Sequence, residues 1–391
     1  MQFSTMKAAD VPVLSEMLST AFAFPAENAP LWLRTAKHSN VRVVREGRRV
    51  LACLIVIPMG HFFGGRSVPT TGIAGVAVSL DARGKGVARW LMEQTLRESA
   101  RKKVPLSTLF PSTQTLYRKV GYERAGKLCE VELATAHFRA PRSDLTSRAL
   151  TKRDEPAVER LYTETARDRN GFLDRGPYMW SRVRKPRGKP TYGVGFFTKA
   201  GELDAYLHFF NGRSDDSLFY TIVVKDAAAR DARGYDAIIS FLGDLRSCGR
   251  TVELRGSPSD PLLMRIAEPH YEERSIEDWM LRVVDARRAL DARGYPRFMR
   301  ASVTLALRDE LFPSNARRLR LDVAEGRGAV SEVKPTKDAL HLDVRALAPL
   351  YTGYLSATRL AALGELEGSA RAIEAADAIF SGPMPSMNEM F

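Results

Sequence analysis

The sequence predicts three consecutive units: a mixed α/β unit at residues 1–142, a second unit of the same organisation at 143–285, and an α+β unit at 286–391. Three observations support this division. Residues 76–88 join an apolar strand pattern to a glycine-rich turn and a helix pattern. The alternation of helix and strand patterns around this turn is repeated further along the chain. The last part instead shows strand patterns followed by helix patterns, which is typical of an α+β layer.

The elements of the first unit follow from periodicity and from stop signals. An amphipathic pattern after Asp10 predicts a helix, and Gly121 is a normal helix stop after the short segment that carries Tyr117. The expected helices are 11–21, one from residue 87 onward, and 113–120; the expected strands are 41–44, 51–58, 73–78 and 107–110.

The turn in the first unit has the composition of an anion-binding loop. Small residues at Gly84, Gly86 and Ala88 let backbone amides approach an anion closely, and the helix that starts there adds a partial positive charge. The sequence therefore predicts a pyrophosphate site here. Its residues are Val76, Ala77, Val78, Arg83, Gly84, Lys85, Gly86, Val87 and Ala88.

Two common phosphate-binding motifs do not fit this turn. A Walker loop needs Lys-Ser or Lys-Thr after its last glycine, and Gly86 is followed by Val87. A dinucleotide fingerprint needs a third glycine where Arg89 stands. Taken alone, the six-residue pattern also fits an ordinary basic turn.

The second unit repeats the pattern of the first without its loop chemistry. A helix is expected at 151–169 and strands at 191–198, 203–210 and 217–224, followed by Asp-Ala-Arg-Gly at 231–234, which echoes 81–84. In this alignment Asp236 and Ile238 stand where Gly86 and Ala88 stand in the first unit. A carboxylate and a branched side chain would repel and crowd a pyrophosphate, so we expect this unit to be catalytically silent.

The third unit reads as a binding module of α+β type. Its expected strands are 301–307, 318–323 and 340–344, and its expected helices are 343–351, 356–363 and 371–380.

Composition excludes several classes of protein. The chain has 391 residues and no apolar run approaching about eighteen residues, so no membrane span is expected. Cys53, Cys129 and Cys248 lie far apart, which argues for a reducing cytoplasm and against a metal site. The net charge of +13 invites a nucleic-acid interpretation, but no recognition motif accompanies it. The densest basic cluster is Arg182, Arg184, Lys185, Arg187 and Lys189; it is broken by prolines and glycine and is expected to be a loop.

Two motifs together resemble the GNAT acyltransferase family. The pattern R-x-x-G-x-[GA] at Arg83, Gly86 and Ala88 is similar to the coenzyme A pyrophosphate loop of that family, and LYRKVGY at 116–122 is similar to the segment that places a tyrosine near the thioester sulfur. The resemblance implies direct attack of an amine on acetyl coenzyme A. It also implies that the Val76 amide polarises the thioester carbonyl and that Tyr117 protonates the departing thiolate. A phenol with an ordinary pKa near 10 suits a basic leaving group.

The order of units resembles Eis-type (enhanced intracellular survival) acetyltransferases, with an active GNAT domain, a degenerate GNAT domain and a sterol carrier protein-like domain. The segments that carry this resemblance are 278–296, 340–364 and the ending AIFSGPMPSMNEMF. It implies a cytoplasmic homohexamer in which the terminal carboxylate of Phe391 is the general base. The apolar, proline-containing tail favours burial, which would raise the pKa of that carboxylate.

The acceptor site is expected from the same resemblance. Carboxylates beside aromatic faces suit a cationic amine. The residues concerned are Phe22, Phe24, Glu27, Trp32 and Glu389. The aromatic members equally fit an N-terminal core cluster. Where aminoglycoside acetylators carry an acid after the first helix, this chain reads Ala-Phe-Ala-Phe, which weakens the expectation of a polycationic acceptor.

The sequence leaves the acceptor open. A primary amine of an aminoglycoside-like compound, a polyamine or a lysine-type amine is expected. The alternatives are a protein lysine, a natural-product amine, or a non-enzymatic module that binds a lipid in the carrier-like domain. Intact Arg83, Gly86, Ala88 and Tyr117 argue against the last alternative.

Overall fold

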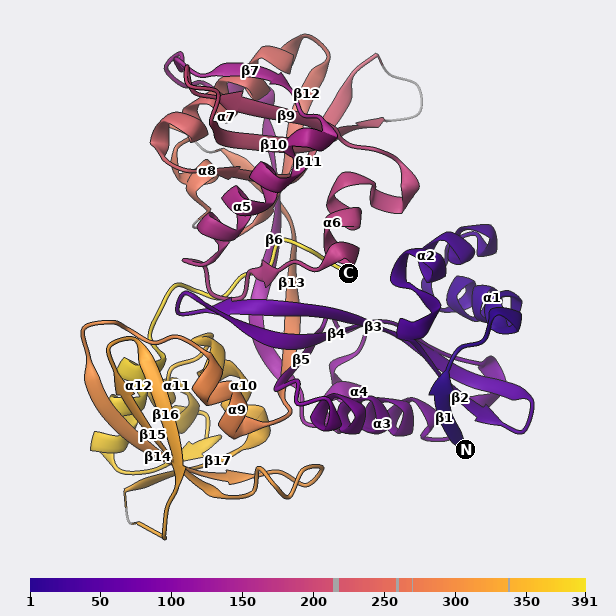
Figure 1. The fold of residues 1–391 in the computed structure, drawn as a ribbon, viewed down its shortest axis with the longest axis vertical. Helices are drawn as coiled ribbons and strands as arrows, with labels where there is room; N and C mark the ends of the chain where they lie inside the picture. Colours follow the sequence, from indigo (N-terminus) through magenta and orange to yellow (C-terminus); the bar gives the residue numbers. More distant parts are fainter. Residues whose placement is uncertain (214–217, 258–259, 269, 337) are drawn as a thin grey trace.

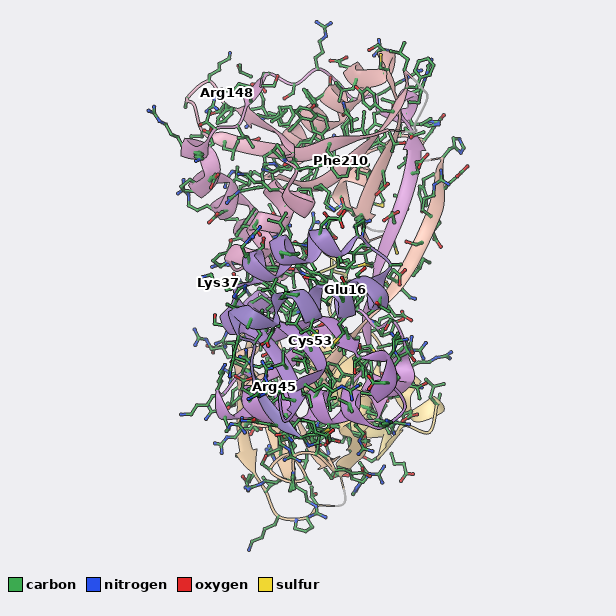
Figure 2. All side chains as sticks on the ribbon, turned by 90° about the vertical axis from the view of Figure 1, so that its right-hand side faces the viewer. Glu16, Lys37, Arg45, Cys53, Arg148 and Phe210 are labelled. Atoms are coloured by element: carbon green, nitrogen blue, oxygen red, sulfur yellow. The ribbon has the colours of Figure 1, made fainter. Side chains whose placement is uncertain are left out.

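The computed structural model describes residues 1–213, 218–257, 260–268, 270–336 and 338–391, and it divides into three units (Figure 1). Seen from the side, the first unit lies toward the viewer with Cys53 inside it, and the second unit, which carries Arg148 and Phe210, lies above it (Figure 2). The described strands of these two units form one sheet of thirteen strands, in the order β1-β2-β3-β4-β5-β13-β6-β12-β11-β10-β9-β7 with β8 paired to β3.

The first unit contains most of the expected elements. It consists of β1 (Gln2–Thr5), α1 (Val11–Phe22), α2 (Ala29–Ala36), β2 (Val41–Glu46), β3 (Arg49–Phe63), β4 (Arg66–Val78), α3 (Val87–Arg101), β5 (Leu106–Leu109), α4 (Gln114–Arg118) and β6 (Glu123–Ala134). Helix α3 turns Leu91, Met92 and Leu96 into the core, while Arg89, Arg97 and Arg101 are exposed. The short elements β1 and α2 and the long strand β6 were not expected from the sequence.

The second unit repeats this order with one additional short strand, β8. It consists of β7 (Thr146–Ala149), α5 (Glu155–Ala166), β8 (Leu173–Asp174), α6 (Pro177–Arg184), β9 (Tyr192–Phe197), β10 (Leu203–Arg213), β11 (Tyr220–Ala229), α7 (Ala232–Asp244), β12 (Gly249–Gly256), α8 (Pro261–Met264) and β13 (Tyr271–Val283). The strand expected at 217–224 corresponds to β11, and Ser217 lies outside the described residues. The basic cluster expected as a loop is partly helical, because Arg182 and Arg184 end α6.

Two long strands join the first two units. β13, the last strand of the second unit, lies between β5 and β6 of the first, and β6 pairs on its other edge with β12. A strand of each unit therefore completes the sheet of the other. This exchange fixes the two units to each other through backbone hydrogen bonds.

The third unit is a separate sheet with helices. Its described elements are α9 (Ala286–Ala292), β14 (Arg300–Arg308), β15 (Arg318–Ala324), β16 (Arg327–Glu332), β17 (Ala339–Asp343), α10 (Val344–Thr352), α11 (Ala357–Ala362), β18 (Leu366–Glu367) and α12 (Ala370–Phe380). The strand order is β16-β15-β14-β17-β18, and β15 alternates buried and exposed residues, as one covered face requires. Helix α10 packs against β6 and β13.

The chain after α12 returns to the other two units, and the C-terminus lies close to α6 (Figure 1). Ser386 forms a parallel bridge with Lys127, and its amide donates to the Asn170 carbonyl at 3.0 Å. A Cβ atom on Gly126 would lie 2.6 Å from the Pro385 carbonyl oxygen, and one on Gly171 would lie 2.8 Å from that of Ser386. The tail therefore occupies a groove that two glycines make deep enough for its backbone.

Candidate active site

Strand β4 has an irregular register beside an opening in the sheet. β4 and β5 pair in parallel from Thr70 to Gly72, and the described residues show no pairing between them beyond that point. On the other edge, Gly75 and Val76 together stand opposite the single residue Leu54, so β4 contains a bulge there. The edge of residues 76–78 that faces the opening can therefore pair with an extended ligand that carries amide groups.

The predicted pyrophosphate loop is open. Gly84 and Gly86 have φ angles of +76° and +77°, and a Cβ atom on either would meet no atom within 4 Å. Gly86 is the N-cap of α3, and no side chain caps the first amides of that helix. Arg83 and Lys85 are exposed beside it. The amides, the helix dipole and the two cations together suit an anion.

The corresponding helix of the second unit is closed to an anion. Asp231 is the N-cap of α7, and its carboxylate accepts a hydrogen bond from the Gly234 amide at 3.1 Å. A Cβ atom on Gly234 would lie 2.9 Å from the Ala229 Cβ, so the backbone there is tightly packed. The alignment that matched Asp236 to Gly86 was wrong in register, because α7 begins within the Asp-Ala-Arg-Gly echo. Asp236 lies inside the helix and accepts from Arg265 Nε at 2.8 Å.

Tyr117 is held inside the first unit at the end of α4. Its side chain is buried, and its ring lies edge-on to that of Tyr122 at a centroid distance of 6.0 Å. Burial raises the pKa of Tyr117 to about 12, although a hydrogen bond with Ser112 lowers it in part. Tyr117 is therefore a neutral phenol at physiological pH. Tyr122 is engaged elsewhere, since its hydroxyl lies 2.7 Å from Ser107 Oγ.

Phe391 lies where β4 and β5 separate. Its ring is edge-on to Phe110, which follows β5, with ring centroids 6.0 Å apart. A Cβ atom on Gly72, the last β4 residue paired with β5, would lie 3.2 Å from the Phe391 ring. The structure thus brings the last residue of the chain to the opening that also borders Val76.

Glu389 points into the second unit. It is buried, and its Oε1 atom accepts from Arg175 Nε at 2.5 Å. Arg175 is a residue that the sequence did not single out, because no local pattern marks it. Because Glu389 is buried and paired with Arg175, its carboxylate is not free to make the contact with the acceptor amine that the sequence predicts. The neighbouring Met390 carbonyl accepts from Arg182 Nη2 at 3.1 Å.

The three aromatic residues expected at the acceptor site form one cluster. Trp32 lies 6.1 Å from Phe22 and 6.0 Å from Phe24 between ring centroids, with both contacts edge-on. Its Nε1 atom donates to the hydroxyl of Tyr178 on α6 at 2.8 Å. A Cβ atom on Gly75 would lie 3.2 Å from the Trp32 ring, so the cluster borders the β4 bulge. Phe22 remains 43% exposed, so its ring is accessible to an acceptor. Glu27 is exposed before α2 and is described in no ion pair.

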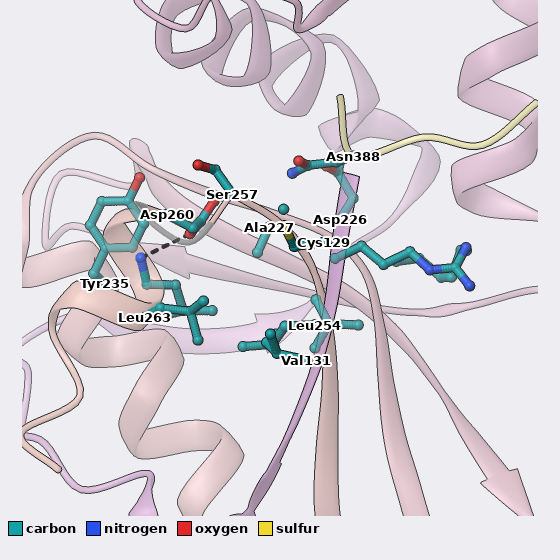
Figure 3. A pocket seen from close by; sticks show the side chains of 15 residues that line it. Cys129, Val131, Asp226, Ala227, Tyr235, Leu254, Ser257, Asp260, Leu263 and Asn388 are labelled. Carbon is teal, nitrogen blue, oxygen red and sulfur yellow. Dashed lines mark hydrogen bonds between the residues drawn. The ribbon is translucent and has the colours of Figure 1, made fainter. Parts of the chain in front are cut away.

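A cavity of the second unit lies at the matching opening between β11 and β12 (Figure 3). These strands pair up to Val223 and Glu253, and the cavity lies beyond that point. Its lining includes Cys129, Tyr235 and, from the C-terminal tail, Asn388. The second unit thus keeps a strand opening but lacks the open helix N-terminus beside it.

The described residues were also compared with the requirements of a metal site and of a membrane span. Within the described parts of the chain, no three His, Cys, Asp or Glu side chains are grouped so that they could hold a metal ion. In those same parts, no helix is both long and apolar enough to cross a membrane.

Comparison with known proteins matches each unit to a family. Residues 2–125 and 171–283 each match a model of the acetyltransferase (GNAT) domain, and residues 286–388 match the sterol carrier protein domain. An uncharacterized N-acetyltransferase of Streptomyces avermitilis is 27% identical over 80% of this chain and 79% of its own length. The N-acetyltransferase Eis of Mycobacterium tuberculosis is 25% identical over 92% of this chain and 91% of its own.

Solved structures agree over the full chain. A GCN5-related N-acetyltransferase from Anabaena variabilis superposes with a TM-score of 0.94 at 29% identity and covers 100% of both chains. One from Kribbella flavida superposes with a TM-score of 0.89 at 26% identity, covering 100% of this chain and 98% of its own. With two GNAT domains, a carrier domain and relatives that match along nearly its whole length, the chain belongs to the Eis-type N-acetyltransferases of the GNAT family.

Proposed function

We propose that the first GNAT domain transfers the acetyl group of acetyl coenzyme A directly to a primary amine. The observation that carries the proposal is the position of Phe391, whose ring packs against Phe110 and Gly72 where β4 and β5 separate. This ring position supports a terminal carboxylate near the bulged strand, along which the thioester would bind. The proposal has four parts: coenzyme binding, a base, an acid and an acceptor site.

Coenzyme binding is assigned to the loop and to the bulged strand. Residues 83–88 would hold the pyrophosphate with backbone amides, and the free edge of Val76–Val78 would pair with the amide-bearing arm of the coenzyme. Support comes from the open space around Gly84 and Gly86 and from the uncapped start of α3. The Val76 amide would polarise the thioester carbonyl, since a backbone donor can stabilise the developing oxyanion.

Phe391 and Tyr117 are assigned the two proton transfers. The Phe391 carboxylate would take a proton from the acceptor ammonium, directly or through a water, so that the free amine attacks the thioester carbonyl. The tetrahedral intermediate then collapses, and the carbon–sulfur bond breaks. Tyr117 would give its proton to the departing thiolate, and the second proton of the amine nitrogen, which leaves as the amide forms, would restore the phenol through solvent. Burial raises the pKa of Tyr117 to about 12, so the phenol carries its proton at neutral pH.

The acceptor is assigned to the aromatic cluster of Phe22, Phe24 and Trp32, together with the exposed Glu27 between Phe24 and Trp32 in the sequence. A partly exposed aromatic surface next to the β4 bulge suits the apolar or cationic part of an amine substrate. Aminoglycoside-like compounds, polyamines and lysine-type amines all meet this description. Acetylation of a protein lysine or of a natural-product amine is the second candidate, because it uses the same chemistry.

The resemblance of the whole chain to Eis-type enzymes also supports a cytoplasmic homohexamer. Light scattering of the purified protein tests the assembly, and six chains per particle is the expected result.

A thiol-release assay tests the reaction. Purified protein is incubated with acetyl coenzyme A and a panel of aminoglycosides, polyamines and lysine-containing peptides, and products are identified by mass spectrometry. We expect release of coenzyme A that depends on the amine, together with a product heavier by one acetyl group. Absence of release with every amine, despite coenzyme binding, would contradict the proposal.

A further inference from the structure

We propose that Arg175 is a positioning residue for the terminal carboxylate and that it acts through Glu389. The inference rests on the proposed role of the Phe391 carboxylate as general base. Arg175 directly follows β8 of the second GNAT domain, whereas Phe391 lies at the opening of the first. The catalytically silent domain would thus supply the anchor that aims the base of the active one.

Arg175 is held rigidly from several directions. Its side chain is 1% exposed, and its two terminal nitrogens donate to the Asp226 carboxylate at 2.6 and 2.8 Å. The guanidinium lies over the Tyr162 ring, 3.5 Å from its centroid. Trp180 lies on another side at 4.7 Å. The Nε atom donates to Glu389 Oε1 at 2.5 Å, and Nη2 lies at the same distance from that oxygen.

Asp226 is itself fixed within the sheet. It belongs to β11, and its carboxylate also accepts from the Tyr206 hydroxyl at 2.6 Å. Burial alone would raise its pKa, but the Arg175 charge and these hydrogen bonds lower the pKa of Asp226 on balance, so it stays ionised. The anchor for Glu389 is therefore a charged pair that cannot swing without breaking several short hydrogen bonds.

The last residues of the tail have few other attachments of this strength. The Met390 carbonyl accepts one hydrogen bond from Arg182, whose side chain is partly exposed. Phe391 adds its ring contact with Phe110. Glu389 precedes the carboxylate by two residues, a span of roughly 7 Å at most, so a shift at Glu389 reaches the base directly. A general base must lie within hydrogen-bond reach of its proton, and a misplacement of about 1 Å can cost about 100-fold in rate.

A buried ion pair contributes little to stability beyond what an apolar residue would contribute, because desolvation offsets its Coulomb energy. The contribution of the ion pair is to fix the position and orientation of Glu389. Glu389 Oε2 has no hydrogen-bond partner among the described residues, so the carboxylate is held through Oε1, which accepts from Arg175 and, at 3.5 Å, from the Tyr162 hydroxyl. This arrangement fixes the position of the tail more than it adds to the stability of the protein.

The test compares Glu389→Ala with a chain that lacks Phe391, at neutral and at alkaline pH. At neutral pH, Glu389→Ala is expected to lower kcat by about 10- to 100-fold while the KM for acetyl coenzyme A changes by less than about twofold. At alkaline pH the amine is already deprotonated and no longer needs a base, so activity returns in both variants. Glu389→Gln keeps an oxygen that can accept from Arg175 and should recover most of the neutral-pH rate.

A control variant shows whether the loss of kcat is specific to Glu389 or follows from removing any carboxylate that pairs with an arginine. Glu98→Gln changes a carboxylate that accepts from Arg42 at 2.6 and 2.9 Å and lies at the far end of α3 from the loop. It should keep both kcat and the wild-type pH profile. Melting temperatures of all variants show whether each one is folded.

The outcomes distinguish failure of the proposed base, Phe391, from failure of the proposed positioning by Arg175 and Glu389. If removal of Phe391 leaves the rate unchanged, the proposed base is wrong. If removal of Phe391 abolishes activity while Glu389→Ala keeps the wild-type rate, the positioning inference alone is overturned. A Glu389→Ala variant whose rate is lowered equally at every pH also overturns it, because a misplaced base must become dispensable as the amine deprotonates.

Discussion

Gly86 and Asp231 are the N-cap residues of α3 and α7, and only Asp231 has a side chain that can accept a hydrogen bond from the first amides of its helix. Gly86 leaves the first turn of α3 without a side-chain cap and with open space around it. Asp231 turns its carboxylate onto the Gly234 amide of α7. One GNAT domain therefore presents a helix N-terminus that an external anion can use, and the other has filled that place with its own carboxylate.

This difference predicts one coenzyme per chain. Gly86→Asp should weaken binding of coenzyme A by about 100-fold or more, because a carboxylate would stand at the pyrophosphate. Gly86→Asn has nearly the same shape and the same strain at φ +77° without the charge, and should bind much better than Gly86→Asp. Calorimetry measures both. Two equivalent sites per chain, or equal losses for Asp and Asn, would refute this prediction.

Tyr117→Phe should lower kcat by about 10²- to 10⁴-fold with little change in coenzyme affinity, since the phenol proton is lost but the ring remains. Tyr122→Phe is the matched control. It loses the hydrogen bond with Ser107, which costs about 1 kcal/mol of stability, and should leave kcat nearly unchanged. Single-turnover kinetics with acetyl coenzyme A measure the chemical step. A Tyr117→Phe enzyme with normal turnover would show that Tyr117 is structural.

His61 should make the protein sensitive to acid. It is buried between the rings of Phe63 and Trp279, and burial lowers its pKa from 6.5 to about 4, although a hydrogen bond with the Gly171 carbonyl raises it in part. The unfolded chain binds a proton near pH 6.5 and the folded chain does not until about pH 4. The free energy of unfolding therefore falls as the pH drops through this window, by up to about 1.4 kcal/mol per pH unit for this group.

His61→Gln should flatten that part of the stability profile, as measured by urea unfolding at a series of pH values. His208 has a similarly lowered pKa, so a residual slope remains in the variant. An unchanged slope between pH 6.5 and 4 would mean that His61 does not contribute.

The glycine groove predicts an effect of Gly171→Ala on catalysis. Gly171 has a φ of +88°, and its added Cβ would press on the Ser386 carbonyl of the tail. Gly201→Ala has a similar φ of +81° but meets nothing within 4 Å. Both should lose about 1–2 kcal/mol of stability to strain, and Gly171→Ala alone should lower kcat through the displaced tail. Equal kcat values for the two variants would contradict this role of the groove.

The local parts of the site could be predicted from the sequence. The loop around Gly84 and Gly86 and the helix that carries Tyr117 are defined by neighbours in the chain, so periodicity and helix stops locate them. Helix α2 was missed because it has only eight residues, too few for a clear helical period. The register of the Asp-Ala-Arg-Gly echo was wrong because four residues do not fix where a helix starts.

The long-range parts could not be derived from local pattern. Arg175 and Glu389 are 214 residues apart, and although Glu389 lies in the C-terminal segment that carries the family resemblance, no local pattern pairs it with Arg175. The exchange of β6 and β13 depends on pairing between strands that are more than a hundred residues apart, which hydrophobic alternation does not encode. The place of Phe391 was expected from the family resemblance and not from the residues around it.

The most direct test of the mechanism changes the Phe391 carboxylate and nothing else. Protein ligation can produce the full chain with a C-terminal amide, which keeps the ring against Phe110 and removes only the negative charge. Acetyl transfer to the best amine is then measured at neutral pH beside calorimetry of coenzyme binding. The account predicts nearly complete loss of turnover with unchanged coenzyme affinity; an amidated enzyme that turns over at the rate of the unmodified chain would contradict it.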